Sequence, residues 1–476
     1  MAIKLNENPA LGDFLVIDKG VEVGGTWRDN TYPGAACDVP SQLYSFSFSP
    51  NRDWSRSFSP QPEIHAYMKR VAEEAGVLDR FRFGVSVESA AWDEADNVWR
   101  ISTTAGEISA NVLVTGSGGL SEPKLPEIDG IDTFAGEIFH SARWNHDYDL
   151  TGKRVAIIGT GASSIQIVPE VAKKVAHLDV YQRTAPWVLP RNDRAYLGVE
   201  KLGFRFVPGF QKAYRTAIYW ALESRVPMFT GQLPQMRIAA TAMAKRNIAK
   251  GITDPELRKT VTPDFEIGCK RVLISNAYYP ALARDNVDVV TDGITEITPT
   301  GLVTSDGTIR EVDAIIVATG FYTTDQPIAA HVKGLDGRTL ADAWSEHGMA
   351  AYKGTTISGF PNLFQIVGPN TGLSHSSMVF IIESQIAYAI SALTTMKAKH
   401  IASVEPLRAA QEEWNADLQS RMQRTVWNSG GCASWYLDEH GKNTILWPRS
   451  TFKFRQLLST FDIDSYVTTP SKEQVA

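Results

Sequence analysis

A glycine turn between a strand and a helix limits most strongly what this chain can fold into. The run VAIIG, which ends at Gly159, is typical of a buried strand, and SSIQIVPEVAKKV continues as a helix. Glycines in such a turn let the backbone approach a pyrophosphate, which then lies at the helix N-terminus with its unpaired N–H groups. Ser164 takes the place of a third glycine and is still small enough for close helix packing. We therefore predict a dinucleotide site at Gly159, Gly161, Ser163 and Ser164.

The strand after this turn bears on which dinucleotide would bind. LDVYQR ends at Arg183, near the position where an NAD site carries an acidic residue for the ribose 2′-hydroxyl. Arg183 and Thr184 suit a 2′-phosphate instead, because a guanidinium pairs well with phosphate oxygens. The sequence thus favours NADP over NAD, and the alternative reading of Arg183 is a solvated surface arginine.

Short β-rich runs alternate with helical stretches, which predicts an α/β fold with parallel sheets. Between about 197 and 263 the strand runs give way to helix formers, so we expect a helical insertion there. After Gly320 the alternation fades, and the apolar segment Ser376–Met396 is expected to form a buried helix. The other predicted strands are Phe14–Asp18, Val112–Gly116 and Ala314–Gly320.

Composition narrows the class of protein. The chain has 476 residues, 43% hydrophobic and 21% charged, as in a globular protein with more than one core. A net charge of −6 argues against nucleic acid as the main partner. The sequence has no run of 18 apolar residues and its N-terminus does not resemble a signal peptide. We therefore expect no stable membrane insertion and a cytoplasmic location.

Neither the cysteines nor any familiar hydrolase or metal motif indicates a reactive site. Cys37, Cys269 and Cys432 are too few and too scattered for a disulfide framework or a CxxC metal site, and we assign them no role. The sequence contains no GxSxG, no HExxH and no clustered Cys/His ligands. Demanding chemistry would therefore have to come from a bound cofactor, and no metal site is expected.

The N-terminal segment has the acidic strand end of a dinucleotide-binding unit but no glycine fingerprint before it. Phe14–Asp18 ends in an acid suited to a ribose hydroxyl, and a glycine fingerprint should precede it by about 20 residues. Counting back from Asp18 passes Met1, and residues 1–12 resemble the end of a crossover helix. We therefore expect that the first strand and the phosphate loop of this second dinucleotide unit are missing.

Several motifs resemble those of one enzyme family. Residues 24–38, GGTWRDNTYPGAACD, resemble the GGxWxxxxYPGxxxD signature of Baeyer–Villiger monooxygenases. Residues 134–144, FAGEIFHSARW, are similar to that family's FxGxxxHxxxW fingerprint, although Asn145 departs from the usual Pro or Asp. Trp144 is typical of the Baeyer–Villiger branch. Further matches are GCKR (268–271), ATGF (318–321) and GFPNLFQIVGPNTGLSH (359–375), whereas Arg449 stands where the family often has glycine.

The resemblance implies an NADPH- and FAD-dependent monooxygenase. In such an enzyme NADPH reduces FAD, the reduced flavin traps O2 as a C4a-peroxyflavin, and one oxygen atom is inserted into a ketone to give an ester or lactone. The family pattern makes Arg271 the fixed positive charge and places Asp38 beside it. Lys270 would join Arg183 and Thr184 at the 2′-phosphate of NADP. The pattern also implies cofactor contacts for Asp18, Gly25, Thr26, Trp27, Tyr32, Asp38 and Asn370.

We expect two Rossmann-like domains: an FAD domain from residues 1–145 and 325–476, and an NADP domain from residues 146–324 that carries the helical insertion. Two other functions stay open. The same flavin could oxygenate nitrogen or sulfur in a soft nucleophile, or the chain could be a non-catalytic relic that binds NADP and cannot hold FAD. The expected partners are O2 and a small ketone or soft nucleophile.

Overall fold

The glycine turn at residues 159–164 follows the central strand of a five-stranded sheet in the computed structural model, which describes residues 1–471. All four neighbouring strand pairs are parallel. The central strands are deeply buried, and Val155, Ala156 and Ile157 are 0% exposed. Across the sheet the order is β12 (Val287–Val290), β9 (His177–Tyr181), β8 (Arg154–Ile158), β16 (Ala314–Val317) and β7 (Glu137–His140), so the sheet includes a strand that precedes residue 146.

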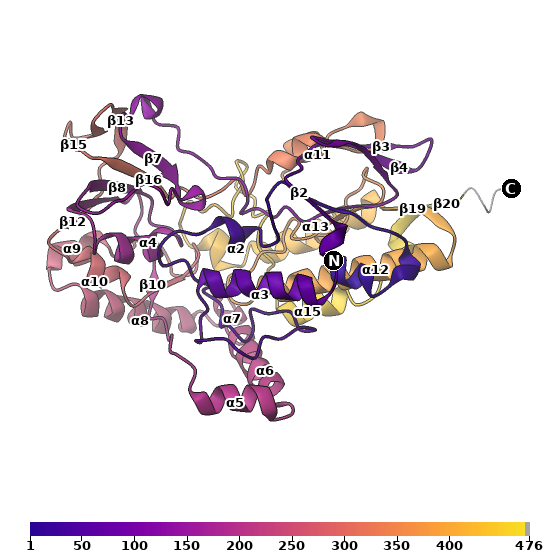
Figure 1. Ribbon diagram of the computed structural model, residues 1–476, viewed down its shortest axis with the longest axis horizontal. Helices are drawn as coiled ribbons and strands as arrows, with labels where there is room; N and C mark the ends of the chain where they lie inside the picture. The colour runs from indigo at the N-terminus through magenta and orange to yellow at the C-terminus, as the bar shows by residue number, and fades with distance from the viewer. Residues whose placement is uncertain (472–476) are drawn as a thin grey trace.

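Alternate side chains of these strands pack on opposite faces of the sheet. Val155 and Ile157 face a cluster with two helices, while Ala156 and Ile158 face a second, smaller sheet. These layers form the left-hand part of Figure 1. The helices are α4 (Ser164–Val171) and α10 (Tyr278–Leu282), and the antiparallel cover consists of β13 (Ile294–Thr298), β14 (Gly301–Thr304) and β15 (Ile309–Glu311).

Two of the remaining sheets combine strands from the beginning and the end of the chain. β17 pairs with β3 and β18 pairs with β6, which joins residues 87–115 to residues 332–365. β1 pairs in parallel with β2 in a sheet of its own, and no third strand joins β1–β2 or β6–β18 within residues 1–471. The strands are β1 (Val16–Asp18), β2 (Phe81–Phe83), β3 (Val87–Asp93), β4 (Val98–Thr103), β5 (Gly106–Ala110), β6 (Leu113–Thr115), β17 (Val332–Lys333), β18 (Leu363–Gln365), β19 (Ile401–Pro406) and β20 (Tyr466–Pro470).

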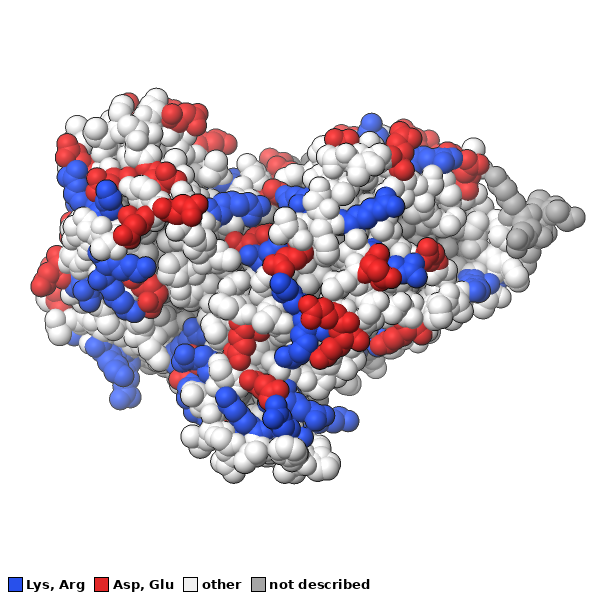
Figure 2. All heavy atoms as spheres, in the orientation of Figure 1, with Lys and Arg blue, Asp and Glu red and all other residues white. Residues whose placement is uncertain are grey.

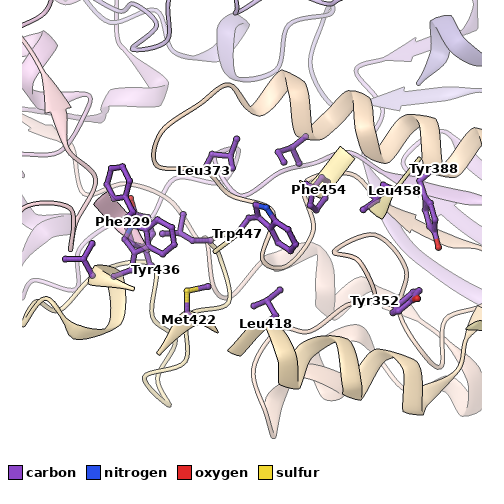
Figure 3. Packing of buried hydrophobic residues seen from close by; sticks show 14 of the residues in the cluster. Phe229, Tyr352, Leu373, Tyr388, Leu418, Met422, Tyr436, Trp447, Phe454 and Leu458 are labelled. Carbon is purple, nitrogen blue, oxygen red and sulfur yellow. The ribbon is translucent and has the colours of Figure 1, made fainter. Parts of the chain in front are cut away.

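A long apolar helix organises the C-terminal part. α12 (Met378–Ala398) confirms the helix expected over Ser376–Met396. By length and composition it could cross a membrane, yet its residues Ile381, Tyr388 and Met396 lie in a large hydrophobic cluster, where Tyr388 packs near Phe454 and Leu458 (Figure 3). It packs against α1 (Ala2–Asn6) and α15 (Thr451–Leu457). The other helices near the two ends of the chain are α2 (Thr26–Asp29), α3 (Gln61–Glu74), α11 (Leu340–Ser345), α13 (Arg408–Met422) and α14 (Val426–Ser429).

Five helices and no strand occupy residues 198–260. α5 and the first turns of α6 project from the body at the bottom of Figure 1. Gly209, with a φ of 76°, makes the left-handed turn between these two helices, a conformation that favours glycine. The helices are α5 (Gly198–Phe206), α6 (Phe210–Glu223), α7 (Val226–Phe229), α8 (Gln235–Gly251) and α9 (Pro255–Thr260), and the short strands β10 (Val188–Leu189) and β11 (Leu273–Ile274) pair on either side of this stretch.

Candidate functional site

Arg271 and Asp38, distant in sequence, form an ion pair. Arg271 Nη2 donates a hydrogen bond to Asp38 Oδ2 at 2.5 Å, and Arg271 Nε donates to the same oxygen at 3.1 Å. The two side chains are about one-third exposed, so the pair is held by the protein and still reachable. The nearby carboxylate raises the pKa of Arg271 above its usual value. Its guanidinium therefore stays charged at any pH at which the protein would work.

Three other segments surround this pair. Arg271 Nη1 donates to the Leu373 carbonyl at 3.4 Å. Arg191 donates to the Cys37 carbonyl at 3.2 Å, which brings a second guanidinium beside Asp38. The side chain of Tyr436 is almost completely buried, and burial raises the pKa of its hydroxyl although the charge of Arg271 opposes the shift. Leu373 and Tyr436 belong to one hydrophobic cluster (Figure 3).

A disulfide joins Cys269 to Cys432, so the expectation that these cysteines have no role is wrong. Cys269 stands two residues before Arg271, and Cys432 stands four residues before Tyr436. The bond therefore ties together two segments that flank the ion pair. The sequence spacing could not reveal this bond, because 163 positions separate the two cysteines. The third cysteine, Cys37, is free and buried.

The segment GGTWRDNTYPGAACD packs against the five-stranded region. Tyr32 donates from its hydroxyl to Gln166 Oε1 at 3.1 Å, and the Gln166 side chain also bonds the backbone N–H and carbonyl of Ala36. Gly34 has a φ of 83°, and a Cβ there would lie 2.6 Å from the Gln166 carbonyl oxygen. Trp27 donates from Nε1 to the Tyr44 hydroxyl at 2.8 Å. The motif is thus attached to α4 through Tyr32, Gly34 and Ala36.

Asp18 lies at the end of β1 and has partners within the chain. Its Oδ1 accepts hydrogen bonds from the Gly20 N–H at 2.7 Å and from Arg28 Nη1 at 3.2 Å. The backbone N–H of Arg28 bonds the Gly25 carbonyl at 3.0 Å, so Arg28 connects the end of this strand to the turn that opens α2. Thr26, the first residue of α2, is exposed. Asp18, Gly25 and Thr26 therefore share one neighbourhood.

The glycine turn after β8 has the form that a bound pyrophosphate requires. Gly159 has a φ of 113°, and a Cβ there would lie 2.5 Å from the Ala318 carbonyl oxygen. Gly161 is exposed and borders open space, while Ser163 precedes the first residue of α4. Ser164 Oγ is buried without a hydrogen-bond partner within the described part of the chain. This helix start has room for an anion.

Arg183 and Lys270 lie close together. Burial and then the charge of Arg183 lower the pKa of Lys270, which is half-buried. Thr160 donates from its hydroxyl to the Thr184 carbonyl at 2.9 Å, so Thr184 adjoins the glycine turn. Two neighbouring cations repel each other unless an anion lies between them. The charges of Arg183 and Lys270 thus interact, and Thr184 follows Arg183 beside the glycine turn; binding of a 2′-phosphate by these residues stays a prediction.

The residues of FAGEIFHSARW support the sheet. Gly136 lies against backbone, since a Cβ there would come 2.5 Å from the Asp313 carbonyl oxygen. His140 ends β7; its Nδ1 accepts from the Ala142 N–H at 3.1 Å, and burial lowers the pKa of His140 to about 4. Trp144 meets Phe139 edge to face at 4.9 Å. His140 is thus neutral near pH 7 and packs in the core.

Asn370 connects the turn before α12 to the C-terminal loop. The side chain is buried, and its Nδ2 donates to the carbonyls of Asn443 at 2.8 Å and of Leu446 at 3.1 Å. Its Oδ1 has no partner within residues 1–471, and the same holds for the buried hydroxyls of Ser374 and Ser376. Three polar atoms without partners therefore occur in one short turn, next to the Leu373 carbonyl that Arg271 contacts.

A buried network that sequence reasoning missed connects α6 to this turn. His375 Nε2 lies 3.1 Å from Glu223 Oε1, and Thr451 donates to both oxygens of Glu223, from its hydroxyl at 2.6 Å and from its N–H at 3.0 Å. These hydrogen bonds lower the pKa of Glu223 although burial opposes the shift. No local pattern points to contacts between residues so far apart in sequence. The helical stretch is thereby attached to the site.

Comparisons with known proteins point to one family. A family model described as "Flavin-binding monooxygenase-like" matches residues 19–333. The chain is 49% identical, over 100% of its length, to a Baeyer-Villiger monooxygenase of Streptomyces coelicolor and covers 91% of that protein. It is 50% identical, over 99% of its length, to a Baeyer-Villiger monooxygenase of Pseudomonas aeruginosa and covers 89% of it. The structure of OTEMO complexed with FAD and NADP matches at 27% identity, with a TM-score of 0.86 and 98% and 97% of the two chains covered. This match confirms the predicted α/β fold.

Proposed function

The chain belongs to the flavin-binding monooxygenase-like family, and from this membership we propose that it is a Baeyer–Villiger enzyme for ketones. It would bind FAD and NADPH and insert one atom of O2 into a ketone to give an ester or lactone. The observation that carries the proposal is the ion pair of Arg271 and Asp38, which lies where the two ends of the chain meet the segment after the helical stretch.

The residues present fit the two cofactors. For NADPH, the open turn at Gly161 and the unpartnered Ser164 hydroxyl suit the pyrophosphate, and the pair of Arg183 and Lys270 suits the 2′-phosphate. For FAD, Asp18 ends β1, and its carboxylate would accept a hydrogen bond from a ribose hydroxyl. When bound, the reduced flavin supplies the activated oxygen that this chain's own side chains do not.

Arg271 would stabilise negative charge on the oxygen atoms of the reacting centre. A ketone carbonyl that is attacked by a nucleophile develops an oxyanion, and a fixed cation in a shielded site stabilises it strongly. Asp38 orients the guanidinium through two hydrogen bonds to one oxygen, and the Leu373 carbonyl accepts a third, so one N–H on each Nη atom stays available to a substrate. Tyr436 and Leu373 shield the pair from water on the side of the hydrophobic cluster.

Product analysis tests this proposal. The chain, supplied with FAD, NADPH and O2, is given a cyclic ketone and an aryl sulfide together, and both products are quantified by mass spectrometry. We expect ester from the ketone. Arg271→Ala should lower ester formation at least about 100-fold, and Arg271→Lys should restore little of it because ammonium lacks the bidentate geometry. Arg246→Ala, which changes an exposed arginine of α8, serves as the matched control.

Two outcomes would contradict the proposal. Sulfoxide without ester would indicate oxygenation of soft nucleophiles by the same cofactors. NADP binding without any flavin binding or oxygenated product would indicate a non-catalytic chain. Binding of NADP by Arg271→Ala, measured by titration, shows in either case that the variant is folded.

A further inference from the structure

The outer face of α5 is apolar and exposed. Val199, Leu202 and Phe206 follow one another at helical spacing, and they are 71%, 59% and 69% exposed. The opposite face is anchored, since Phe204 is buried and stacks on Phe210 with ring centroids 5.4 Å apart. This helix therefore has apolar side chains on both its inner and its outer face, whereas the outer face of a typical surface helix is polar.

The exposed apolar surface continues beyond α5. Val207 follows the helix directly and is 54% exposed, and Leu197 precedes it at 63%. Farther along α6, a separate exposed pair is formed by Trp220 and Phe452 of α15, each 54% exposed, with ring centroids 6.2 Å apart. Single exposed apolar residues are ordinary, but a contiguous group of this kind marks a surface that contacts something else. We call the exposed residues Leu197, Val199, Leu202, Phe206 and Val207 the apolar tip.

The helices α5–α8 together are basic in an acidic protein, and the part that borders the apolar tip, α5 and α6, contributes Lys201, Arg205, Lys212 and Arg215. Residues 197–251 contain nine lysines and arginines, which are Lys201, Arg205, Lys212, Arg215, Arg225, Arg237, Lys245, Arg246 and Lys250, and two acids, Glu200 and Glu223. Their net charge is 9 − 2 = +7, whereas the whole chain carries −6, so that the rest of the chain carries −13. One stretch of helices thus holds a charge opposite to that of the remaining protein.

The charge and the apolar residues are arranged in space as two zones. Figure 2 shows uncharged atoms at the lowest point of the molecule and a group of lysines and arginines immediately above them. Figure 1 places this lowest point at α5 and the start of α6. On α5 itself, Lys201 and Arg205 are the direct neighbours of Leu202 and Phe206 in the sequence. We call the lysines and arginines above the apolar tip in Figure 2 the basic collar. An apolar end with a basic collar matches an anionic membrane surface, which has acyl chains inside and phosphates outside.

We propose that the apolar tip docks the protein on the surface of a membrane that contains anionic phospholipids. Leu202 and Phe206 enter the boundary between headgroups and acyl chains, and Lys201 and Lys212 contact lipid phosphates, whereas Arg205 already pairs with Asp53 at 2.8 Å. The protein rests on the bilayer without crossing it. This docking would bring the helical stretch, and through the contact of Glu223 with His375 the neighbourhood of Arg271, close to apolar compounds dissolved in the membrane.

Charge favours a bilayer over the other occupants of such a surface. Two copies of this chain meeting at their tips would bring two like-charged pairs of helices together, since α5 and α6 carry 4 − 2 = +2 in each copy, and these repel each other. Nucleic acid would match the basic collar but not the exposed leucine, valine and phenylalanine side chains at its centre. The surface of an anionic bilayer is both anionic and apolar and satisfies both zones.

Vesicle sedimentation tests the proposal with the full chain. Wild-type protein is mixed with vesicles of phosphatidylcholine alone or with phosphatidylglycerol added, at low and at high salt. We expect binding to the mixed vesicles that is at least tenfold stronger than to phosphatidylcholine alone and that weakens with salt. Leu202→Glu/Phe206→Glu should lower this binding at least tenfold. Leu125→Glu/Ile309→Glu, which changes two residues of similar exposure away from the helices, should leave it unchanged.

Folding and self-association are measured on the same samples. Circular dichroism and NADP titration show whether each variant is folded, and sedimentation velocity without lipid shows whether it is monomeric. Equal binding of wild type and Leu202→Glu/Phe206→Glu, or no binding of wild type to either vesicle, overturns the proposal. So does a dimer in the absence of lipid that the double substitution disrupts, because the tip would then contact a second copy.

Discussion

The two dinucleotide regions of this protein are built from strands of similar sequence and differ in how their sheets are completed. In the five-stranded sheet, β8 has strands on both sides, and Val155, Ala156 and Ile157 are 0% exposed. In the other region, β1 pairs with β2 alone and β6 with β18 alone within residues 1–471. Val16 and Ile17 of β1 are only half-buried, although FLVID is as apolar as VAIIG.

The difference shows that burial of a strand is decided by its neighbours more than by its own residues. A parallel strand with partners on both edges and helices on its faces is removed from water on every side. A strand with one partner leaves an edge and part of its side chains accessible. The same kind of apolar sequence should therefore contribute unequally to stability in the two regions.

The largest expected effect is a difference between two equivalent substitutions. Ile157→Ala in β8 should lower the free energy of unfolding by about 3–5 kcal/mol, because it leaves a cavity in a sealed core. Ile17→Ala in β1 should lower it by about 1 kcal/mol, because part of that side chain already meets water. Urea unfolding of both variants measures the difference. Equal losses in the free energy of unfolding would show that the two strands contribute equally to stability, against this account.

The disulfide is expected to have the next largest effect, since it lies where the two regions meet. Cys432→Ser should lower the free energy of unfolding by about 2–4 kcal/mol, because it releases a crosslink that closes a long loop. Cys269→Ser and the double substitution should give the same loss, since all three remove one bond. A reducing agent should shift the wild-type melting temperature and leave these variants unaffected; a shift in the variants would argue against this account.

Acid should destabilise the five-stranded region through His140. Burial lowers the pKa of His140 to about 4 in the folded protein. In the unfolded chain the histidine pKa is near 6.5, so as the pH falls the unfolded chain takes up a proton on His140 before the folded protein does. The stability that neutral His140 provides is complete above about pH 6.5 and is lost progressively toward pH 4. Between about pH 7.5 and pH 5 the loss is about 2 kcal/mol.

Two substitutions isolate this contribution. His140→Asn keeps an acceptor for the Ala142 N–H and should remove the pH dependence, as measured by urea unfolding at both pH values. His146→Asn, which changes an exposed histidine, serves as the control. If His140→Asn loses as much stability on acidification as the wild type does, another group is responsible.

The smallest expected effect concerns the choice of nicotinamide cofactor. Arg183→Ala and Lys270→Ala should each weaken NADP binding about tenfold, because each removes a cation from the 2′-phosphate. NAD binding should change little, which calorimetric titration with both nucleotides would show. Lys174→Ala, at the other end of α4, is the matched control. An equal loss for NADP and NAD would mean that these residues act on the fold instead.

Sequence reasoning reached the fold and the family because both depend on local patterns. The glycine turn at Gly159, the helix α12 and the long motifs are each contained in one short segment. It did not reach the disulfide between Cys269 and Cys432 or the contact of Glu223 with His375, because such contacts depend on how distant segments pack. The ion pair of Arg271 with Asp38 was implied by the resemblance alone. The absent first strand and phosphate loop, and every assigned cofactor contact, stay predictions.

The most direct test of the account is an anaerobic titration of the purified chain, with FAD in excess, by NADPH while the visible absorption of the flavin is followed. The account predicts that NADPH bleaches the bound flavin, that NADH does so much more weakly, and that air with a ketone restores the band as ester is formed. A chain that binds NADPH yet leaves the flavin band unchanged would contradict it, because the two dinucleotide regions would then not work as one enzyme.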